Sequence, residues 1–171
     1  MISKEKIIYL IRHAKSSWDR AGMSDWERDL NERGRRDGPR MAQYCCDHFS
    51  KPDLVLSSDS QRTKSTAAYL VKSGWANDQH LTFKNDLYLA SSDEIIDILE
   101  AQSDEISSIA ILAHNPGIHL AAMQMSENSN IRNFPTFSIV RLRAPINDWS
   151  SLSRFKCELD SFVFPKKLFM D

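Results

Sequence analysis

Short apolar blocks alternate along the chain with longer blocks of helical periodicity. The apolar blocks are rich in β-branched residues, as buried strands are, and lie at 7–11, 54–56, 81–84 and 108–113. The blocks between them repeat apolar residues with the spacing of a helix face, at about 31–49, 60–74, 91–99 and 117–125. Because strands that alternate with helices pair in parallel, the pattern predicts an α/β fold, a three-layer αβα sandwich with a mostly parallel central sheet.

Three of the predicted helices begin at residues that cap helix N-termini. Asn31 and Ser60 precede the first two helices, and the run Ser91-Ser92-Asp93-Glu94 opens the third. Gly38 and Pro39 fall inside the first helix, where proline cannot donate a backbone hydrogen bond. We therefore expect either irregular first turns or a later start for that helix.

The last part of the chain has a different pattern, in which apolar and polar residues alternate one by one. This period of two appears at 137–143 and again at 154–159. It is typical of strands with one buried face, so the two segments predict a hairpin near a sheet edge, with an antiparallel strand near the C-terminus. The sequence contains no repeat, linker or low-complexity stretch, and residues 1–171 are predicted to form a single domain.

Charge and cysteine content narrow the class of protein. The formal net charge of −1 argues against nucleic acid as a partner, because that contact needs a basic surface. No apolar run approaches the ~20 residues of a membrane-spanning helix, and the first residues are too polar for a secretory signal, so no membrane association is expected. The three cysteines are odd in number, and the adjacent Cys45 and Cys46 are unlike a disulfide framework or a metal site, which favours a reducing, cytoplasmic location.

Charged residues follow directly on three of the predicted strands. Arg12 and His13 end the first, Arg62 lies just inside the helix after the second, and His114 ends the fourth. Because the carboxyl ends of parallel strands meet at one edge of a sheet, we expect these side chains to converge there. Arginine binds phosphate through paired donors, and histidine can act as a base or a covalent nucleophile. The two arginines also predict a pKa of His13 below its usual value.

The same positions carry a resemblance to a known family. In order and spacing the sequence is similar to the histidine phosphatase superfamily, also called the phosphoglycerate mutase-like family, in Arg12-His13, Ser57-Ser58-x-x-x-Arg62-Thr63 and His114-Asn115-Pro116-Gly117. The run Arg-His-Ala-Lys-Ser-Ser-Trp in so short a chain most resembles the SixA-type phosphohistidine phosphatase subgroup. The resemblance extends from about Ile7 to about Gln124 and is weak over the last ~45 residues.

This resemblance implies a phosphoglycerate mutase-like fold and a phosphatase without a cofactor. It implies that His13 is the nucleophile and carries a transient phosphoryl group, with Arg12, Arg62 and His114 around the phosphate. Phosphoryl transfer mainly requires positioning and stabilisation of charge, which two guanidinium groups and an imidazole can supply without a metal.

Three more residues are candidates for substrate binding. Ser16 stands where the family has a small hydroxyl beside the phosphate. Arg28 lies in the polar loop after the first strand and contacts phosphate or a partner carboxylate, unless it is a solvated charge, and Asn115 either orients the ligand or makes a turn. Asp19 replaces a common asparagine, and since a carboxylate repels phosphate we expect it to turn away or to pair with Lys15 or Arg28.

The wider family has a glutamate after the third strand that protonates the leaving group, and this sequence has none in register. Asp86 and Glu94 lie nearby but match no motif, so either of them or no residue acts as the acid. An alkoxide leaving group needs such an acid, typically worth ~10²–10⁴-fold in rate. The imidazole of phosphohistidine has a conjugate-acid pKa near ~6.5 and needs less help. The missing acid therefore favours phosphohistidine on a protein, such as a signalling domain, as the substrate.

Two other functions stay open at the level of the sequence. The same site would suit hydrolysis of a small phosphorylated molecule or a mutase reaction, although 171 residues leave little chain for the lid that a mutase needs. A non-catalytic phosphate-binding module is the other alternative. It is disfavoured because a binder does not need the nucleophilic His13.

Overall fold

The computed structural model describes residues 5–18, 20–127 and 130–170, and its centre is a six-stranded sheet in the order β3-β2-β4-β1-β5-β6. The strands are β1 (Lys6–Arg12), β2 (Leu54–Ser58), β3 (Leu81–Lys84), β4 (Ser108–Ala113), β5 (Ile139–Ala144) and β6 (Glu158–Val163). The first four pair in parallel, whereas β5 runs antiparallel to β1 and β6 antiparallel to β5. The mostly parallel sheet and the C-terminal hairpin at its edge are confirmed.

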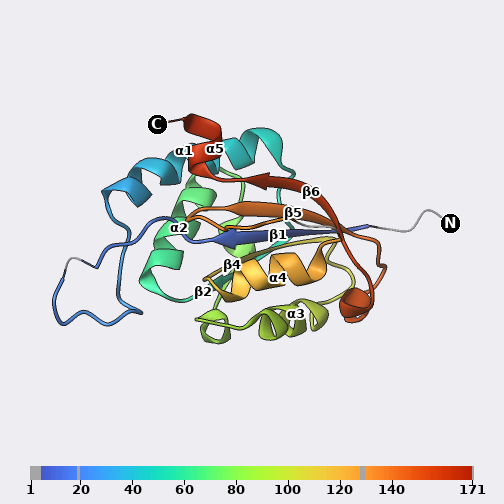
Figure 1. The fold of residues 1–171 in the computed structure, drawn as a ribbon. Helices are drawn as coiled ribbons and strands as arrows, with labels where there is room; N and C mark the ends of the chain where they lie inside the picture. The colour runs from blue at the N-terminus through green and yellow to red at the C-terminus, as the bar shows by residue number, and fades with distance from the viewer. Residues whose placement is uncertain (1–4, 19, 128–129, 171) are drawn as a thin grey trace.

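Helices cover both faces of this sheet (Figure 1). The helices are α1 (Glu32–His48), α2 (Gln61–Lys72), α3 (Ser92–Glu100), α4 (Gly117–Met125) and α5 (Pro165–Phe169), with short 3-10 helices η1 (Asp78–His80), η2 (Asn85–Leu87) and η3 (Trp149–Arg154). One face carries α1, α2 and α5, and the other carries α3 and α4 (Figure 1). Two separate apolar clusters fill the spaces between the layers, so the predicted three-layer sandwich is confirmed.

Strand β1 connects the two apolar clusters at the centre of the sheet. Ile8 and Leu10 belong to the cluster on the α3 and α4 side, whereas Tyr9 and Ile11 belong to the cluster under α1 and α2. All four are fully buried, as the period of two along a central strand requires. The strand therefore has no freedom to shift its register, and the residues that follow it are delivered to a defined place.

Helix α1 is continuous through Gly38 and Pro39, so the expectation of irregular first turns or a later start is wrong. Asn31 caps the helix as predicted, and its side chain accepts a hydrogen bond from the amide of Gly34 at 2.9 Å. A Cβ at Gly38 would lie 2.5 Å from ring atoms of Tyr69, so the glycine lets α1 pack closely on α2. Packing of an amphipathic helix outweighs the local cost of one proline.

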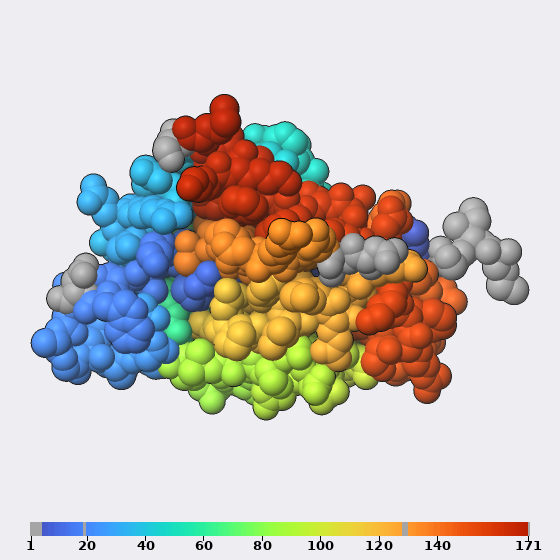
Figure 2. Space-filling view, viewed as in Figure 1, coloured from blue at the N-terminus to red at the C-terminus, as the bar shows by residue number. Residues whose placement is uncertain are grey.

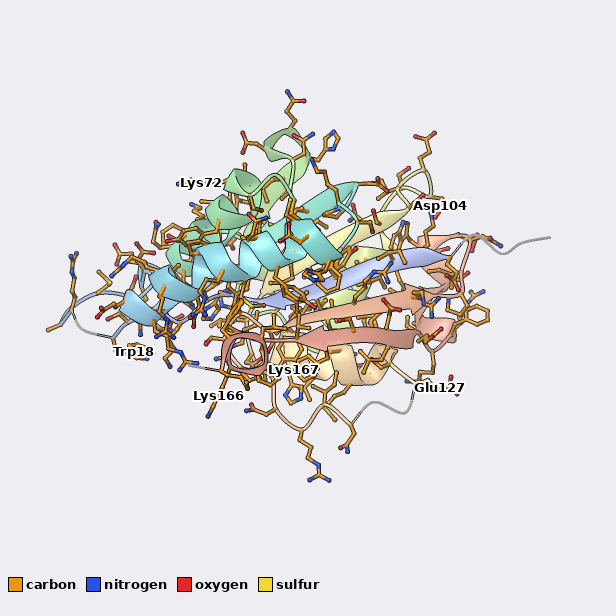
Figure 3. The ribbon with its side chains drawn as sticks, turned by 90° about the horizontal axis from the view of Figure 1, so that it is seen from above. Trp18, Lys72, Asp104, Glu127, Lys166 and Lys167 are labelled. Atoms are coloured by element: carbon orange, nitrogen blue, oxygen red, sulfur yellow. The ribbon has the colours of Figure 1, made fainter. Side chains whose placement is uncertain are left out.

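The carboxyl ends of the parallel strands share one edge of the sheet. The loop 13–30 leaves β1 at this edge, and α2 begins there after β2 (Figure 1). In Figure 3, Trp18 of this loop and Asp104, which precedes β4, lie at opposite ends of the molecule. Within the described residues, no helix has the length and apolar content needed to cross a membrane.

Candidate active site

His13 follows β1 directly and is held from several sides. Its backbone amide donates to Ala113 and its carbonyl accepts from the amide of Phe137. Its Nδ1 lies 2.7 Å from the carbonyl oxygen of Ala14, and Nε of Arg62 donates to its Nε2 at 3.3 Å. Because a guanidinium only donates, Nε2 is the unprotonated nitrogen and Nδ1 carries the proton. The ring is thus fixed in one tautomer with its lone pair on Nε2.

Arg62 comes from the first turn of α2 and connects the other groups of the site. It is only 2% exposed. Besides His13, its Nη2 contacts Nδ1 of His114 at 3.3 Å, so both imidazoles accept from one guanidinium. The helix positions this residue because Thr66, one turn later, accepts from the amide of Ala14 at 3.0 Å and ties α2 to the end of β1.

His114 lies at the end of β4, with its ring centroid 5.2 Å from that of His13. Since Arg62 donates to Nδ1, the proton is on Nε2, which donates to Oγ of Ser58 at 2.8 Å. Burial, together with the positive charge of Arg62, lowers the pKa of His114 to about 3. His114 is therefore a neutral, oriented imidazole at neutral pH.

Arg12, the last residue of β1, has donors that the protein leaves unused. Its Nη1 donates to the carbonyl oxygen of Phe134 at 2.9 Å, while its buried Nε has no hydrogen-bond partner within the described part of the chain. Burial and the nearby charge of Arg62 lower its pKa below the usual value of an arginine. A buried donor without a partner is costly.

These four side chains line one cavity of about 340 Å³. The structure therefore brings together the four residues that were predicted to converge from distant parts of the sequence, Arg12, His13, Arg62 and His114. The direction predicted for the pKa of His13 is confirmed, since it lies well below 6.5. The predicted cause is incomplete, because burial lowers this pKa more than His114 or either arginine does.

The three additional candidates also line the cavity. Nη1 of Arg28 donates to Oγ of Ser16 at 2.7 Å, so these two residues form one unit rather than solvated surface groups. Asn115 donates to the carbonyl oxygen of Phe134 at 3.1 Å, and its Oδ1 has no partner among the described residues.

Asp25 is a central residue that sequence reasoning missed. Its carboxylate accepts from Nη2 of Arg62 at 3.0 Å, from Nε of Arg28 at 3.0 Å and from the hydroxyl of Tyr88 at 2.5 Å. Burial raises its pKa, but the hydrogen bonds from Tyr88 and Arg62 outweigh that effect and lower the pKa to about 2. Its spacing of three residues from Arg28, which allows a salt bridge within one turn, was the available signal.

Neither candidate for the general acid lies in the cavity lining. Glu94 accepts from the amide of Ser91 at 2.7 Å in a capping box, and the exposed Asp86 lies 3.6 Å from Nζ of Lys84. Asp19 lies outside the described residues, and the arginine suggested as its partner, Arg28, pairs with Asp25. The residues that the structure describes contain no group of His, Cys, Asp and Glu side chains suited to a metal ion.

Large apolar side chains are exposed at the mouth of the cavity. Trp18 is 73% exposed and its ring lies 3.7 Å from the guanidinium carbon of Arg28. Leu89 is 57% exposed and has a φ of 54°, a conformation that is strained for a branched side chain. Both residues line the cavity, so its entrance is apolar while its floor is cationic.

Comparisons with known proteins agree with this geometry. Residues 8–82 match the model of the histidine phosphatase superfamily, branch 1. An uncharacterized chloroplastic protein of Arabidopsis thaliana is 30% identical over 154 residues, which cover 83% of this chain and 68% of that protein.

Solved structures show the same fold. One, described as a proposed phosphohistidine phosphatase SixA from Agrobacterium tumefaciens, is 26% identical with a TM-score of 0.81, covering 94% of this chain and 98% of that one. The protein histidine phosphatase SixA complexed with tungstate is 18% identical with a TM-score of 0.79, covering 95% of this chain and 99% of that one. The predicted fold and enzyme class are confirmed at this level, and the chain belongs to the histidine phosphatase superfamily.

Proposed function

We propose that this protein hydrolyses phosphohistidine carried by another protein, through a covalent intermediate on His13. The observation that carries the proposal is the fixed, neutral imidazole of His13, which lines the cavity and whose unprotonated Nε2 accepts a hydrogen bond from Nε of Arg62. A site that only bound phosphate would gain nothing from a nucleophile held in this tautomer. The protein histidine phosphatase SixA binds tungstate, a tetrahedral oxyanion like phosphate, on the same fold.

In the first step Nε2 of His13 attacks phosphorus in line, forming one N–P bond as the N–P bond of the substrate breaks. The leaving imidazole keeps a proton on its other ring nitrogen and departs neutral. In the second step water attacks phospho-His13, releasing inorganic phosphate and restoring the free imidazole. The first step needs Nε2 of His13 to be free of a proton, which the lowered pKa of His13 favours, and in the second step His13 leaves as the neutral imidazole with its proton on Nδ1.

Arg12 and Arg62 stabilise the charge of the transferring phosphoryl group. Arg12 lines the cavity, and its guanidinium can donate to the incoming oxyanion there. Arg28 is held beside Ser16 at the same cavity and adds a third guanidinium. When the phosphoryl group enters, Nε of Arg62 exchanges its hydrogen bond to Nε2 of His13 for one to a phosphoryl oxygen, which frees the lone pair of Nε2 for attack.

The proposal of phosphohistidine as the substrate depends on the absence of a protonated general acid among the described residues that line the cavity. Asp25, the carboxylate of the cavity lining, has a pKa of about 2 and is hydrogen-bonded to two arginines, so it carries no proton to donate at neutral pH. A phosphate monoester would have to expel an alkoxide without help. The exposed apolar entrance at Trp18 and Leu89 also suits a group presented on a protein surface.

A substrate panel tests the proposal directly. Turnover is measured on a phosphohistidine peptide, a phosphoserine peptide and a sugar phosphate, each with and without a chelator. We expect phosphohistidine to be hydrolysed fastest, with no effect of the chelator. Rapid quenching at alkaline pH followed by mass spectrometry should find the added phosphoryl group on His13. Faster hydrolysis of either ester would contradict the substrate assignment, and a phosphoryl group on another residue would contradict the nucleophile.

A further inference from the structure

A second cavity, of about 260 Å³, lies between α1 and α5 and takes no part in the proposed reaction. The cavity is lined by three arginines one turn apart on one face of α1, Arg33, Arg36 and Arg40, and by Lys166 of α5. We call it the basic cavity. It shares no lining residue with the candidate active site.

The basic cavity concentrates positive charge in a chain that has almost none overall. The sequence contains 22 basic and 23 acidic residues. Among the residues that the structure describes, the carboxylate that lines this cavity is that of Asp37, which is 4% exposed and lies 3.5 Å from Arg33 and 3.1 Å from Arg36. A local excess of one sign creates a field that attracts the opposite charge.

The cavity is built from groups that are already ordered. The guanidinium carbon of Arg40 lies 4.1 Å from the ring centroid of Phe169 in α5, and the buried Asp37 orients Arg33 and Arg36. Ordered side chains lose less conformational entropy when they bind a partner. The arrangement therefore suits recognition better than a set of freely solvated charges would.

The basic cavity lies next to the candidate active site because the first turn of α1 packs on the strand end. The amide of Asn31 donates to the carbonyl oxygen of Lys15 at 3.0 Å, and a Cβ at Gly34 would lie 2.1 Å from the same atom. Lys15 lines the active-site cavity, and Arg33 directly precedes Gly34. Figure 2 shows α5 (red), the start of α1 (light blue) and the loop after β1 (blue) on one face of the molecule.

We propose that the basic cavity docks an acidic surface of the phosphorylated protein substrate while its phosphohistidine enters the active site. This inference rests on the proposed function. A small substrate that fills only the active-site cavity makes no contact with Arg36, Arg40 or Lys166. A protein that presents its phosphohistidine to His13 extends over the neighbouring face, and complementary charge there speeds its association.

The test compares the parent protein with the double variant Arg36→Gln/Lys166→Gln. Both side chains are exposed, and the Arg33–Asp37 pair remains to stabilise the buried carboxylate. The matched control is Lys72→Gln/Arg154→Gln, which removes the same charge from exposed positions outside the basic cavity. Lys72 and Lys166 lie on opposite sides of the molecule in Figure 3.

Two substrates are used, a phosphohistidine protein with a strongly acidic surface and free phosphohistidine. For the double variant we expect kcat/KM on the protein at low ionic strength to fall about tenfold through KM, an effect that salt removes. We expect no change on free phosphohistidine, and no change for the control on either substrate. An equal loss on both substrates, or no loss on the protein, overturns the docking surface. If the parent protein hydrolyses neither substrate, the proposed function fails, and the docking proposal fails with it.

Discussion

The two ends of β1 each carry a cation, Lys6 buried and Arg12 partly buried, and the protein supplies hydrogen-bond partners to the two cations differently. Lys6, at the amino end, is 4% exposed, and its Nζ donates to the carbonyl oxygens of Asp104 at 2.6 Å and Ile106 at 2.7 Å. The same Nζ lies 5.4 Å from the ring centroid of Trp149. Arg12, at the carboxyl end, has a buried Nε without a partner in the described residues and lines the active-site cavity.

The difference separates a structural charge from a functional one. The protein supplies fixed acceptors for Lys6, so removing that cation takes a donor from two carbonyl oxygens and acts on stability. It leaves a donor of Arg12 unused, so removing that cation acts on the ligand that would complete the site. The balance of hydrogen-bond donors and acceptors distinguishes the two cations.

The largest effect is expected at the residue next to Arg12. His13→Ala removes the proposed nucleophile and should lower turnover of phosphohistidine by at least about 10³-fold. Binding of inorganic phosphate should persist, because both arginines remain. His48→Ala, on the exposed end of α1, is the matched control and should retain full activity. Turnover of His13→Ala at the parental rate would rule out covalent catalysis at this residue.

Arg12→Gln tests the carboxyl end of β1 itself. The loss of a preorganised donor to the transferring phosphoryl group should reduce kcat/KM about 10²–10³-fold. The melting temperature should not fall, since the variant loses a partly buried charge whose buried Nε had no hydrogen-bond partner among the described residues. Steady-state kinetics and calorimetry measure the two effects. A fall in the melting temperature with activity retained would give Arg12 the role assigned to Lys6.

Lys6→Met tests the amino end. Methionine preserves most of the side-chain volume but removes the ammonium donor to two carbonyl oxygens. That of Ile106 still accepts from Nε1 of Trp149, whereas that of Asp104 loses this donor, so the free energy of unfolding should decrease by about 2 kcal/mol. Urea denaturation measures this change. Activity per folded molecule should equal that of the parent. A loss of kcat in the folded variant would contradict the purely structural role assigned to Lys6.

Asp25→Asn tests how strongly the negative charge of Asp25 weakens the attraction of the site's arginines for phosphate. Its carboxylate pairs with Arg62 and Arg28 and repels an incoming dianion. Neutralising it should therefore lower the inhibition constant of inorganic phosphate about three- to tenfold. Tyr88→Phe, which removes one hydrogen bond to Asp25 without changing its charge, should alter this constant less. Weaker phosphate binding by Asp25→Asn would mean that the carboxylate serves chiefly to position the arginines.

The smallest expected effect is that of pH. The pKa of His114 is about 3, so acidification from about pH 8 to about pH 5 should not protonate its ring, and its Cε1–H NMR signal should keep the chemical shift of neutral imidazole. The pKa of His13 is lowered by burial, so its Cε1–H signal should not titrate with a midpoint near 6.5. After correction for spontaneous hydrolysis, kcat/KM should not fall with a midpoint near 6.5. Titration of His13 with such a midpoint would show that its environment is more polar than the structure indicates.

Much of this molecule follows from local pattern. The buried strands at 7–11 and 108–113, the cap at Asn31 and the capping box at Ser91 were all readable, because periodicity and capping are short-range. The irregular start predicted for α1 from Pro39 was wrong, because the packing of Gly38 on Tyr69 is a tertiary contact that local helix propensity does not include. Arg12, His13, Arg62 and His114 could be predicted since the ends of parallel strands meet at one edge of a sheet.

The sequence by itself determined the order of strands and helices and the four side chains at the strand ends. Only the tertiary structure decided how charge is balanced there, because Asp25, Arg28 and Tyr88 come together through a loop of no regular pattern. The same holds for the basic cavity, where α1 meets α5 from the far end of the chain. A periodic pattern specifies which face of an element is buried, whereas the pairing of charges depends on distances that exist only in the folded chain.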